Sequence, residues 1–96
     1  MDERVGVVGI VIDDRKEAAN EVNEILSRYG NLIMGRMGVP RDENNMGVIS
    51  LLVEGTTDDI GALTGELGSI TEVSVKSALT SRVGSVKISM KEKDAR

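Results

Sequence analysis

The stretch VGVVGIVI, residues 5–12, decides the fold, because it is a β-branched run that is apolar at both odd and even positions. A strand with one wet face alternates apolar and polar residues, whereas a strand covered on both faces does not. The run therefore predicts a central strand of a sheet. Asp13 and Asp14 end it.

A helix is predicted directly after this strand. Asp14 and Glu17 have the spacing of a capping box, with Asp in place of the usual Ser or Thr, so the helix should begin near Arg15. Gly30 stands where a C′ glycine would end it. Apolar residues recur at helical spacing between these points, at Ala18, Val22, Ile25, Leu26 and Tyr29.

The next two segments, residues 31–39 and 46–55, are predicted strands. Gly35 and Gly38 weaken the first of them and mark an edge position, a bulge or a close backbone approach. The stretch RMGVPRDENN, residues 36–45, contains the only proline of the chain and is predicted to supply the hairpin loop between the two strands.

A second helix and a fourth strand follow. Thr57 or Asp58 can cap the helix, which should end near Gly68 and bury a stripe formed by Ile60, Leu63 and Leu67. The segment ITEVSVKSAL, residues 70–79, alternates as a half-exposed strand does: Val73, Val75 and Leu79 share one face, and Glu72, Ser74 and Lys76 share the other.

The predicted order βαββαβ is that of an α+β ferredoxin-like sandwich, with a four-stranded antiparallel sheet and two helices on one face. The first and third strands should be central. Residues 1–82 make up this domain, and residues 83–96 form a C-terminal extension in which Val86, Ile88 and Met90 alternate as in an added strand before a charged tail.

The two-faced central strands predict self-association. Helices cover one sheet face only, so a monomer would expose the apolar residues of the other. In a chain of 96 residues the economical cover is a second copy, and we expect a homodimer or homotetramer.

Composition excludes several functions. A net charge of -4 argues against direct binding of nucleic acid, which rewards clustered Lys and Arg. The absence of Cys and His removes the usual ligands of zinc, nickel and copper and the common catalytic nucleophile and base. We therefore expect no cofactor and no enzymatic activity. The N-terminus lacks a secretion signal and no stretch is long enough to span a membrane, so a cytoplasmic protein without membrane contact is expected.

Some local patterns could bind a ligand. Arg36 and Arg41 bracket the predicted hairpin and could receive a carboxylate or phosphate, although a solvated hairpin is the simpler interpretation. Gly61, Gly65 and Gly68 could leave backbone N–H groups free for an anion, or could allow close helix packing. The aspartate pairs at 13–14 and 58–59 are better explained as helix caps than as acid–base or cation sites.

The chain resembles the family of proposed iron-only hydrogenase system regulators. The resemblance is carried over residues 4–80 by VGIVIDDRKEAANEVNEIL, RMGVP, ENNMGVISLLVEG and DDIGALTGELGSITEVSVKS. It implies a ferredoxin-like fold similar to ACT domains, which oligomerise and bind small ligands, often amino acids, at subunit interfaces. It also implies similarity to the ligand-binding domain of the nickel-responsive regulator. This chain lacks the histidines, the cysteine and the DNA-binding segment of that regulator, so nickel sensing and direct DNA binding are not implied.

The resemblance to ACT domains also implies a ligand site at a strand-to-helix loop containing Asp and Gly. The matching segment is TTDDIGALTGELG, which indicates Asp59, Ile60 and Gly61, although Ile60 replaces the proline common before the glycine. With Arg36 and Arg41 as counter-charges, these residues form the predicted site for a small polar or anionic ligand.

The sequence therefore favours a regulatory protein that is non-enzymatic, oligomeric and built to bind a small ligand or to assemble with itself, and the resemblance links it to an iron-only hydrogenase system. A purely structural oligomer is the first alternative. A ferredoxin-like enzyme such as an acylphosphatase is the second. It is disfavoured because the segment IDDRK, after the first strand, is acidic and lacks the glycine of a phosphate-binding loop.

Overall fold

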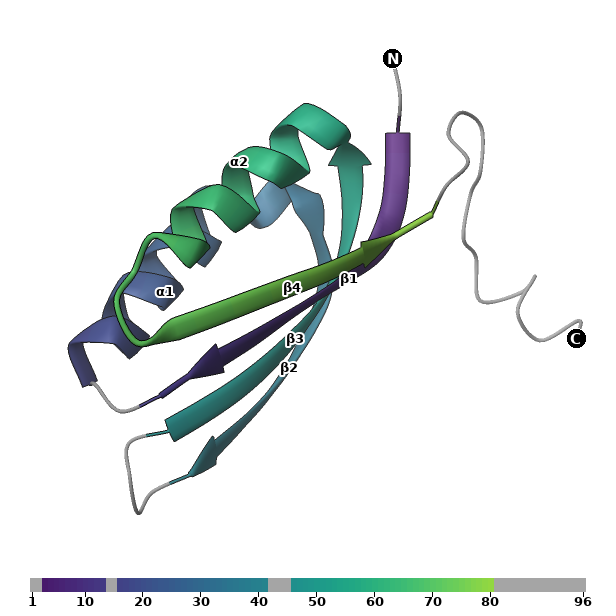
Figure 1. Ribbon diagram of the computed structural model, residues 1–96. Coiled ribbons are helices and arrows are strands. Elements are labelled where there is room, and N and C mark those ends of the chain that lie inside the picture. The colour runs from purple at the N-terminus through teal and green to yellow at the C-terminus, as the bar shows by residue number, and fades with distance from the viewer. Residues whose placement is uncertain (1–2, 14–15, 42–45, 81–96) are drawn as a thin grey trace, which may run out of the picture.

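The computed structural model describes residues 3–13, 16–41 and 46–80 (Figure 1). Four strands, two helices and one 3-10 turn follow one another along the chain: β1 (Glu3–Ile12), α1 (Lys16–Arg28), η1 (Gly30–Leu32), β2 (Ile33–Arg41), β3 (Met46–Thr56), α2 (Thr57–Gly68) and β4 (Val73–Leu79).

The strands form one antiparallel sheet in the order β2-β3-β1-β4, and both helices lie on the same face of it (Figure 1). The predicted ferredoxin-like βαββαβ sandwich is confirmed, with β1 and β3 in the centre. In register, Gly9 of β1 lies opposite Ser50 of β3 on one side and Lys76 of β4 on the other.

The core lies between the sheet and the helices, and it follows from the period of two along each strand. Val8, Ile10 and Ile12 of β1 point toward the helices and are at most 4% exposed. They pack with alternate residues of β3 and with the apolar stripes of both helices: Ile49, Leu51 and Val53, then Val22, Ile25 and Leu26, then Ile60, Leu63 and Leu67. No buried side chain of the described residues is polar or charged.

The N-cap of α2 is Thr56, one residue before the earlier of the two predicted caps. The hydroxyl oxygen of Thr56 accepts a hydrogen bond of 3.0 Å from the backbone N–H of Asp59. Thr56 keeps extended backbone angles, so it serves both as the last residue of β3 and as the cap. The strand therefore passes into the helix without a loop.

The connection from α1 to β2 also differs from the prediction. Gly30 does not end α1 as a left-handed cap but begins η1, which carries Leu32 into the core. Because η1 occupies residues 30–32, β2 starts at Ile33 and not at the predicted residue 31, and its pairing with β3 shifts register before Gly35. Gly55 makes room for Leu32, since a Cβ at Gly55 would lie 2.8 Å from Leu32 Cδ2.

The strand predicted over residues 31–39 is confirmed as β2, but it continues through residues 40 and 41, which the prediction placed in the hairpin loop. The backbone of Pro40 lies opposite Gly47, and a proline is tolerated there because β2 is an edge strand. The rest of that loop and the C-terminal extension with its predicted added strand lie outside the described residues. In the part of the chain that is described, neither helix combines the length and apolar character needed to cross a membrane.

Candidate ligand-binding site

A pocket of about 220 Å³ lies between α1 and the paired strands β2 and β3. Gly38 and Gly47 form its floor: Gly38 lies opposite the buried Ile49, and Gly47 lies opposite the buried Ile12. Because neither glycine carries a side chain, the backbone itself is open to a bound molecule. A Cβ at either position would meet only ordinary contacts, the nearest atoms being 3.7 and 3.8 Å away.

Arg36 and Asn23 form the polar part of this pocket. Arg36 Nη2 of β2 donates a hydrogen bond of 3.1 Å to Asn23 Oδ1 of α1. This bond engages one of the five N–H donors of the guanidinium and fixes the side chain beside the helix. The remaining donors have the fork geometry that suits a carboxylate or phosphate.

The other side chains of the pocket are apolar. Ile12, Ala19 and Ile49 are walls that continue the core. Val39, Met46 and Val48 border the pocket along β2 and β3, although the register directs the side chains of Val39 and Val48 to the other face of the sheet. A site with one cation, one amide and aliphatic walls suits a small amphipathic anion better than a fully hydrated one.

The structure places the other predicted site residues elsewhere. Ile60 is 2% exposed and belongs to the core. Asp59 is exposed at the start of α2, where its N–H is taken by Thr56. Gly61 lines a separate groove beside β4. Arg41 is the last residue of β2, and only its backbone is described. In the described part of the chain, therefore, Arg36 and Gly61 line different pockets.

The three glycines of α2 are not closely packed against any other described part of the chain. A Cβ at Gly61, Gly65 or Gly68 would have no neighbour within 4 Å among the described residues. They line the groove of about 540 Å³ between α2 and β4, together with Val73 and Val75. Close helix packing, the other interpretation of these glycines, is therefore not found among the described residues.

An acidic pocket of about 430 Å³ lies at the start of α1, where Glu17, Glu21 and Glu72 line it with Ser69 and Thr71. Its negative charge disfavours an anionic ligand. In residues 3–13, 16–41 and 46–80 no three acidic side chains converge closely enough to hold a metal ion.

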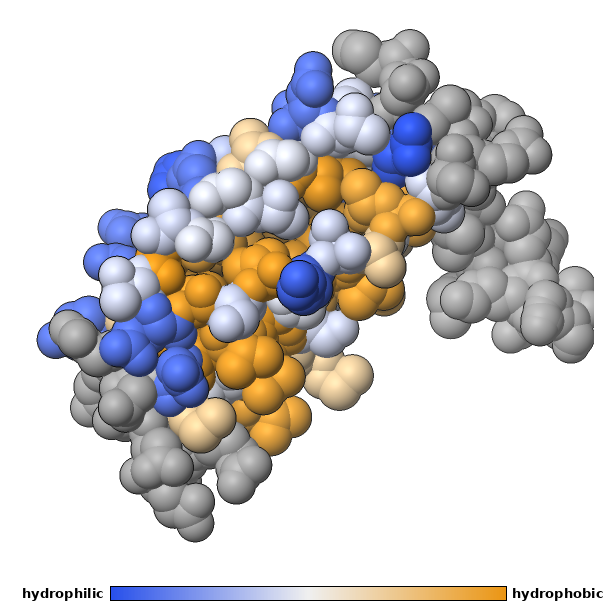
Figure 2. Space-filling model, viewed as in Figure 1, coloured by the Kyte–Doolittle hydropathy of each residue, from blue (hydrophilic) through white to orange (hydrophobic). Residues whose placement is uncertain are grey.

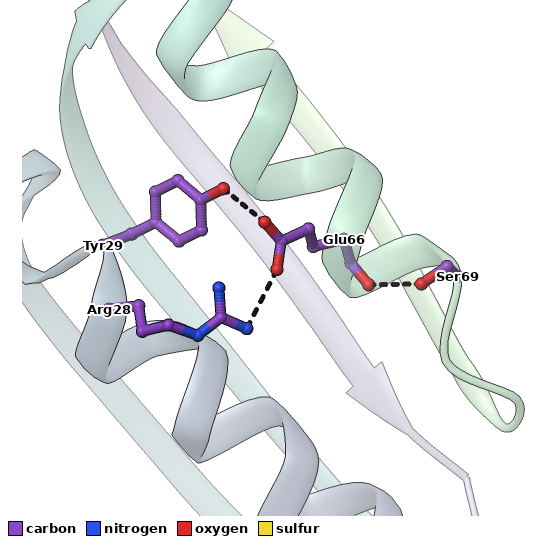
Figure 3. A network of polar contacts seen from close by, with 4 residues as sticks. All are labelled: Arg28, Tyr29, Glu66 and Ser69. Carbon is purple, nitrogen blue, oxygen red and sulfur yellow. Dashed lines mark hydrogen bonds and ion pairs between the residues drawn. The ribbon is translucent and has the colours of Figure 1, made fainter.

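A polar network joins the end of α1 to α2 (Figure 3). Tyr29 donates a hydrogen bond of 2.5 Å to Glu66 Oε2, and Arg28 Nη2 lies 3.0 Å from Glu66 Oε1. Ser69 Oγ donates to the backbone oxygen of Glu66 at 2.8 Å. The hydrogen bond from Tyr29, and then that from Arg28, lower the pKa of the Glu66 carboxyl, while the bond to Glu66 raises the pKa of Tyr29.

This network predicts a pH-dependent contribution to stability. The pKa of Glu66 is lower in the folded chain than its ordinary value of 4.5, so ionised Glu66 stabilises the fold above that value and the contribution is lost as the pH falls through the folded pKa. Glu66→Gln should lower the free energy of unfolding at pH 7, and its difference from wild type should shrink as the pH is lowered below 4.5. Urea unfolding across this range measures both. Tyr29→Phe, which removes the first cause of the shift, should show part of the same effect, and a difference independent of pH would contradict this role of Glu66.

The fold defines a class, an ACT-like α+β domain, which in this chain has a cavity between α1 and the β2–β3 pair. The chain belongs to the TM1266-like family, whose description reads "Iron-only hydrogenase system regulator, putative" and whose model matches residues 4–77. The predicted family is thereby confirmed. No curated protein matches the chain.

Solved structures agree with this assignment. The uncharacterized protein TM1266 from Thermotoga maritima is 40% identical, with a TM-score of 0.77, and the match covers 81% of this chain and 98% of that one. The ACT domain of the GTP pyrophosphokinase from Chlorobium tepidum is 18% identical in its crystal structure, with a TM-score of 0.67 and coverage of 79% and 99%. At this identity the second likeness shows the fold alone.

The sequence indicated only part of the pocket. Arg36 was a predicted site residue, and Gly38 was marked as an edge position, a bulge or a close backbone approach, of which the edge position is observed. Asn23 could not be identified as a site residue from the sequence, because a polar residue on a helix face is ordinarily solvated. Ile12 and Ile49 read as core residues, and they are core residues that also border the pocket.

Proposed function

We propose that this chain is a non-enzymatic regulatory module that binds a small amphipathic anion in the pocket between α1 and the β2–β3 pair. The observation that carries the proposal is the Arg36 guanidinium, held by Asn23 beside an aliphatic pocket with a glycine floor. A ligand with one carboxylate and a short branched or linear apolar part matches this combination in charge and size.

The residues of the pocket support binding rather than catalysis. Its lining consists of glycines and apolar side chains with Arg36 and Asn23, and none of these is a general base or an activated nucleophile. An arginine with an amide can hold and orient an anion. The pocket by itself therefore supports recognition without a chemical step.

The site also offers a route from binding to regulation. The Arg36–Asn23 hydrogen bond joins β2 to α1. A ligand that binds the same guanidinium would therefore change the contact between the sheet and the helix. The family description supplies the context, an iron-only hydrogenase system, which we propose as the process regulated.

Thermal unfolding with three probes tests the binding proposal. Isovalerate combines a carboxylate with an apolar group, L-leucine adds an ammonium, and inorganic phosphate offers charge alone. Isovalerate or leucine should raise the melting temperature of the wild type in a saturable way, and phosphate should do so less. Arg36→Met should abolish the shift, because it retains the aliphatic bulk but removes the fork of donors.

Gly38→Val is the matched test of the pocket itself. The Cβ of the new side chain would meet only ordinary contacts, and valine suits an exposed edge strand, so the variant should be at least as stable as the wild type without ligand. It fills the floor, however, and should lose the ligand-induced shift. A shift that survives both Arg36→Met and Gly38→Val would place the ligand elsewhere, and no shift with any of the probes would reject the amphipathic-anion proposal.

A further inference from the structure

The sheet face opposite the helices carries a contiguous apolar surface. Six large aliphatic side chains of β1, β2 and β3 lie on it and are between 39% and 69% exposed: Val7, Val11, Met37, Val39, Val48 and Leu52. Figure 2 shows the molecule from the side of β4, with hydrophobic surface below α2 and hydrophilic surface along the helices and at the ends; the residues of the sheet face itself follow from the strand register.

The strand register arranges these side chains around a hollow centre. Leu52 pairs with Val7 on one side of the middle row, and Val48 pairs with Val11 on the other. The middle row itself contains Ser50 and Gly9, so little or no side chain rises there. At the β2 end of this row stands Met37, the most exposed of the six at 69%. The face thus carries both a projecting flexible side chain and a shallow site that could receive one.

The charged residues on this face favour a second copy of the chain over nucleic acid or an anionic membrane as the partner. Among its strand residues whose side chains are described, the charged ones are Glu3 and Glu54 toward one end and Lys76 on the edge strand β4. One lysine does not make the basic cluster that nucleic acid or an anionic membrane requires. Charges of both signs at the margin around an apolar centre are what a self-complementary interface needs.

We propose that the sheet face is the surface on which two copies of this chain pair face to face. The exposed apolar area of the six side chains is on the order of 500 Å², at the upper end of what monomers leave open. With the polar margin it approaches the roughly 800 Å² per partner of a stable interface. Stacked sheets lie about 10 Å apart, a distance at which Met37 of one copy can reach the shallow row of the other.

This inference is independent of the ligand pocket, which opens on the helix side of the sheet. The two surfaces share only Val39 and Val48, so the test uses other positions. Leu52→Glu places a carboxylate in the middle of the proposed interface. Ala62→Glu places the same charge on the exposed side of α2 and serves as the matched control.

Light scattering after gel filtration, at micromolar concentrations and above, provides the first measurement. The wild type should have the mass of a dimer or a higher even assembly, Leu52→Glu should have half that mass with an unchanged circular dichroism spectrum, and Ala62→Glu should match the wild type. A monomeric wild type at 100 micromolar would overturn the proposal. An unchanged mass for Leu52→Glu, or dissociation by Ala62→Glu alone, would also overturn it.

Crosslinking identifies the face directly, because the chain contains no cysteine. Ser50→Cys introduces a single thiol in the middle row, and a short bifunctional maleimide should link two copies through it. Ala62→Cys should remain uncrosslinked at the same concentration. Efficient linkage through position 62 and none through position 50 would show that the copies pair through their helices.

Discussion

Replacing Ile10 with aspartate is expected to abolish folding. Ile10 is fully buried between the sheet and the helices, and none of the described residues buried beside it is polar or charged, so the new carboxylate would have no partner in the core. An unpaired buried charge costs several kcal/mol, and the lost aliphatic packing adds about 2–5 kcal/mol. A domain of this size has only about 5–15 kcal/mol of total stability. Circular dichroism should show loss of helicity and of a cooperative thermal transition.

Val11→Asp is the matched control for this prediction. Val11 is the next residue of the same strand, but it lies on the opposite sheet face and is 39% exposed. Its carboxylate can reach water in a single chain, so the variant should retain helicity and lose only association. An Ile10→Asp variant that stays folded, or a Val11→Asp variant that is equally unfolded, would show that the assignment of the two faces is wrong.

Gly6→Ala is expected to have the second largest effect, although it adds a single methyl group. A Cβ at Gly6 would overlap the carbonyl oxygen of Ala78 and lie 2.9 Å from the Cα of Leu79. The obstacle is backbone, so β1 and β4 would have to separate where Thr80 N–H donates to the carbonyl of Val5 at 2.9 Å. We expect a loss of about 3 kcal/mol in the free energy of unfolding.

Gly9→Ala tests whether this loss is specific to Gly6. It is the next glycine of β1, on the other face, and the nearest atom to its Cβ would be the carbonyl oxygen of Lys76 at 3.9 Å. Its free energy of unfolding in urea should stay within about 1 kcal/mol of the wild type. Equal losses for the two variants would contradict the close approach of β1 and β4 at Gly6.

The sheet order was predictable because β1 and β3 are apolar at both odd and even positions, a pattern that indicates central strands covered on both faces. The run from Val5 to Ile12 is apolar at every position except its glycines, and the structure uses the even positions for the helices and leaves the odd ones on the open face. The alternation in β4 was equally explicit, since Val73 and Val75 face the core side opposite Ile12 and Ile10.

Local chain reversals were less predictable, because they depend on contacts distant in sequence. Gly30 was predicted to end the helix as a C′ glycine. Instead it begins η1, which places the Leu32 side chain in the core against Gly55. Glu72 adopts a φ of 75°, a backbone conformation unusual for a residue with a side chain. Its carbonyl oxygen accepts a 2.7 Å hydrogen bond from the N–H of Asp13, a pairing across 59 positions that no local pattern reveals.

The candidate site contains one residue that local sequence indicated and one that depends on a contact distant in sequence. Arg36 was identifiable as a cation beside glycines, but its partner Asn23 comes from α1 and becomes visible only when that helix lies across β2. The predicted anion site at Asp59–Gly61 assumed free N–H groups at the start of α2. Thr56 occupies the N–H of Asp59, and the side chains of Asp58 and Asp59 add negative charge to the same turn.

The central claim, that a small amphipathic anion binds between α1 and the β2–β3 pair, is tested most directly by titrating the isotope-labelled protein with isovalerate and following its amide resonances. The account predicts saturable shifts of the backbone amides of Gly38 and Gly47 and of the side-chain amide of Asn23, all abolished by Arg36→Met. Largest shifts at Gly61 and Gly65, or saturable shifts that persist in Arg36→Met, would contradict it.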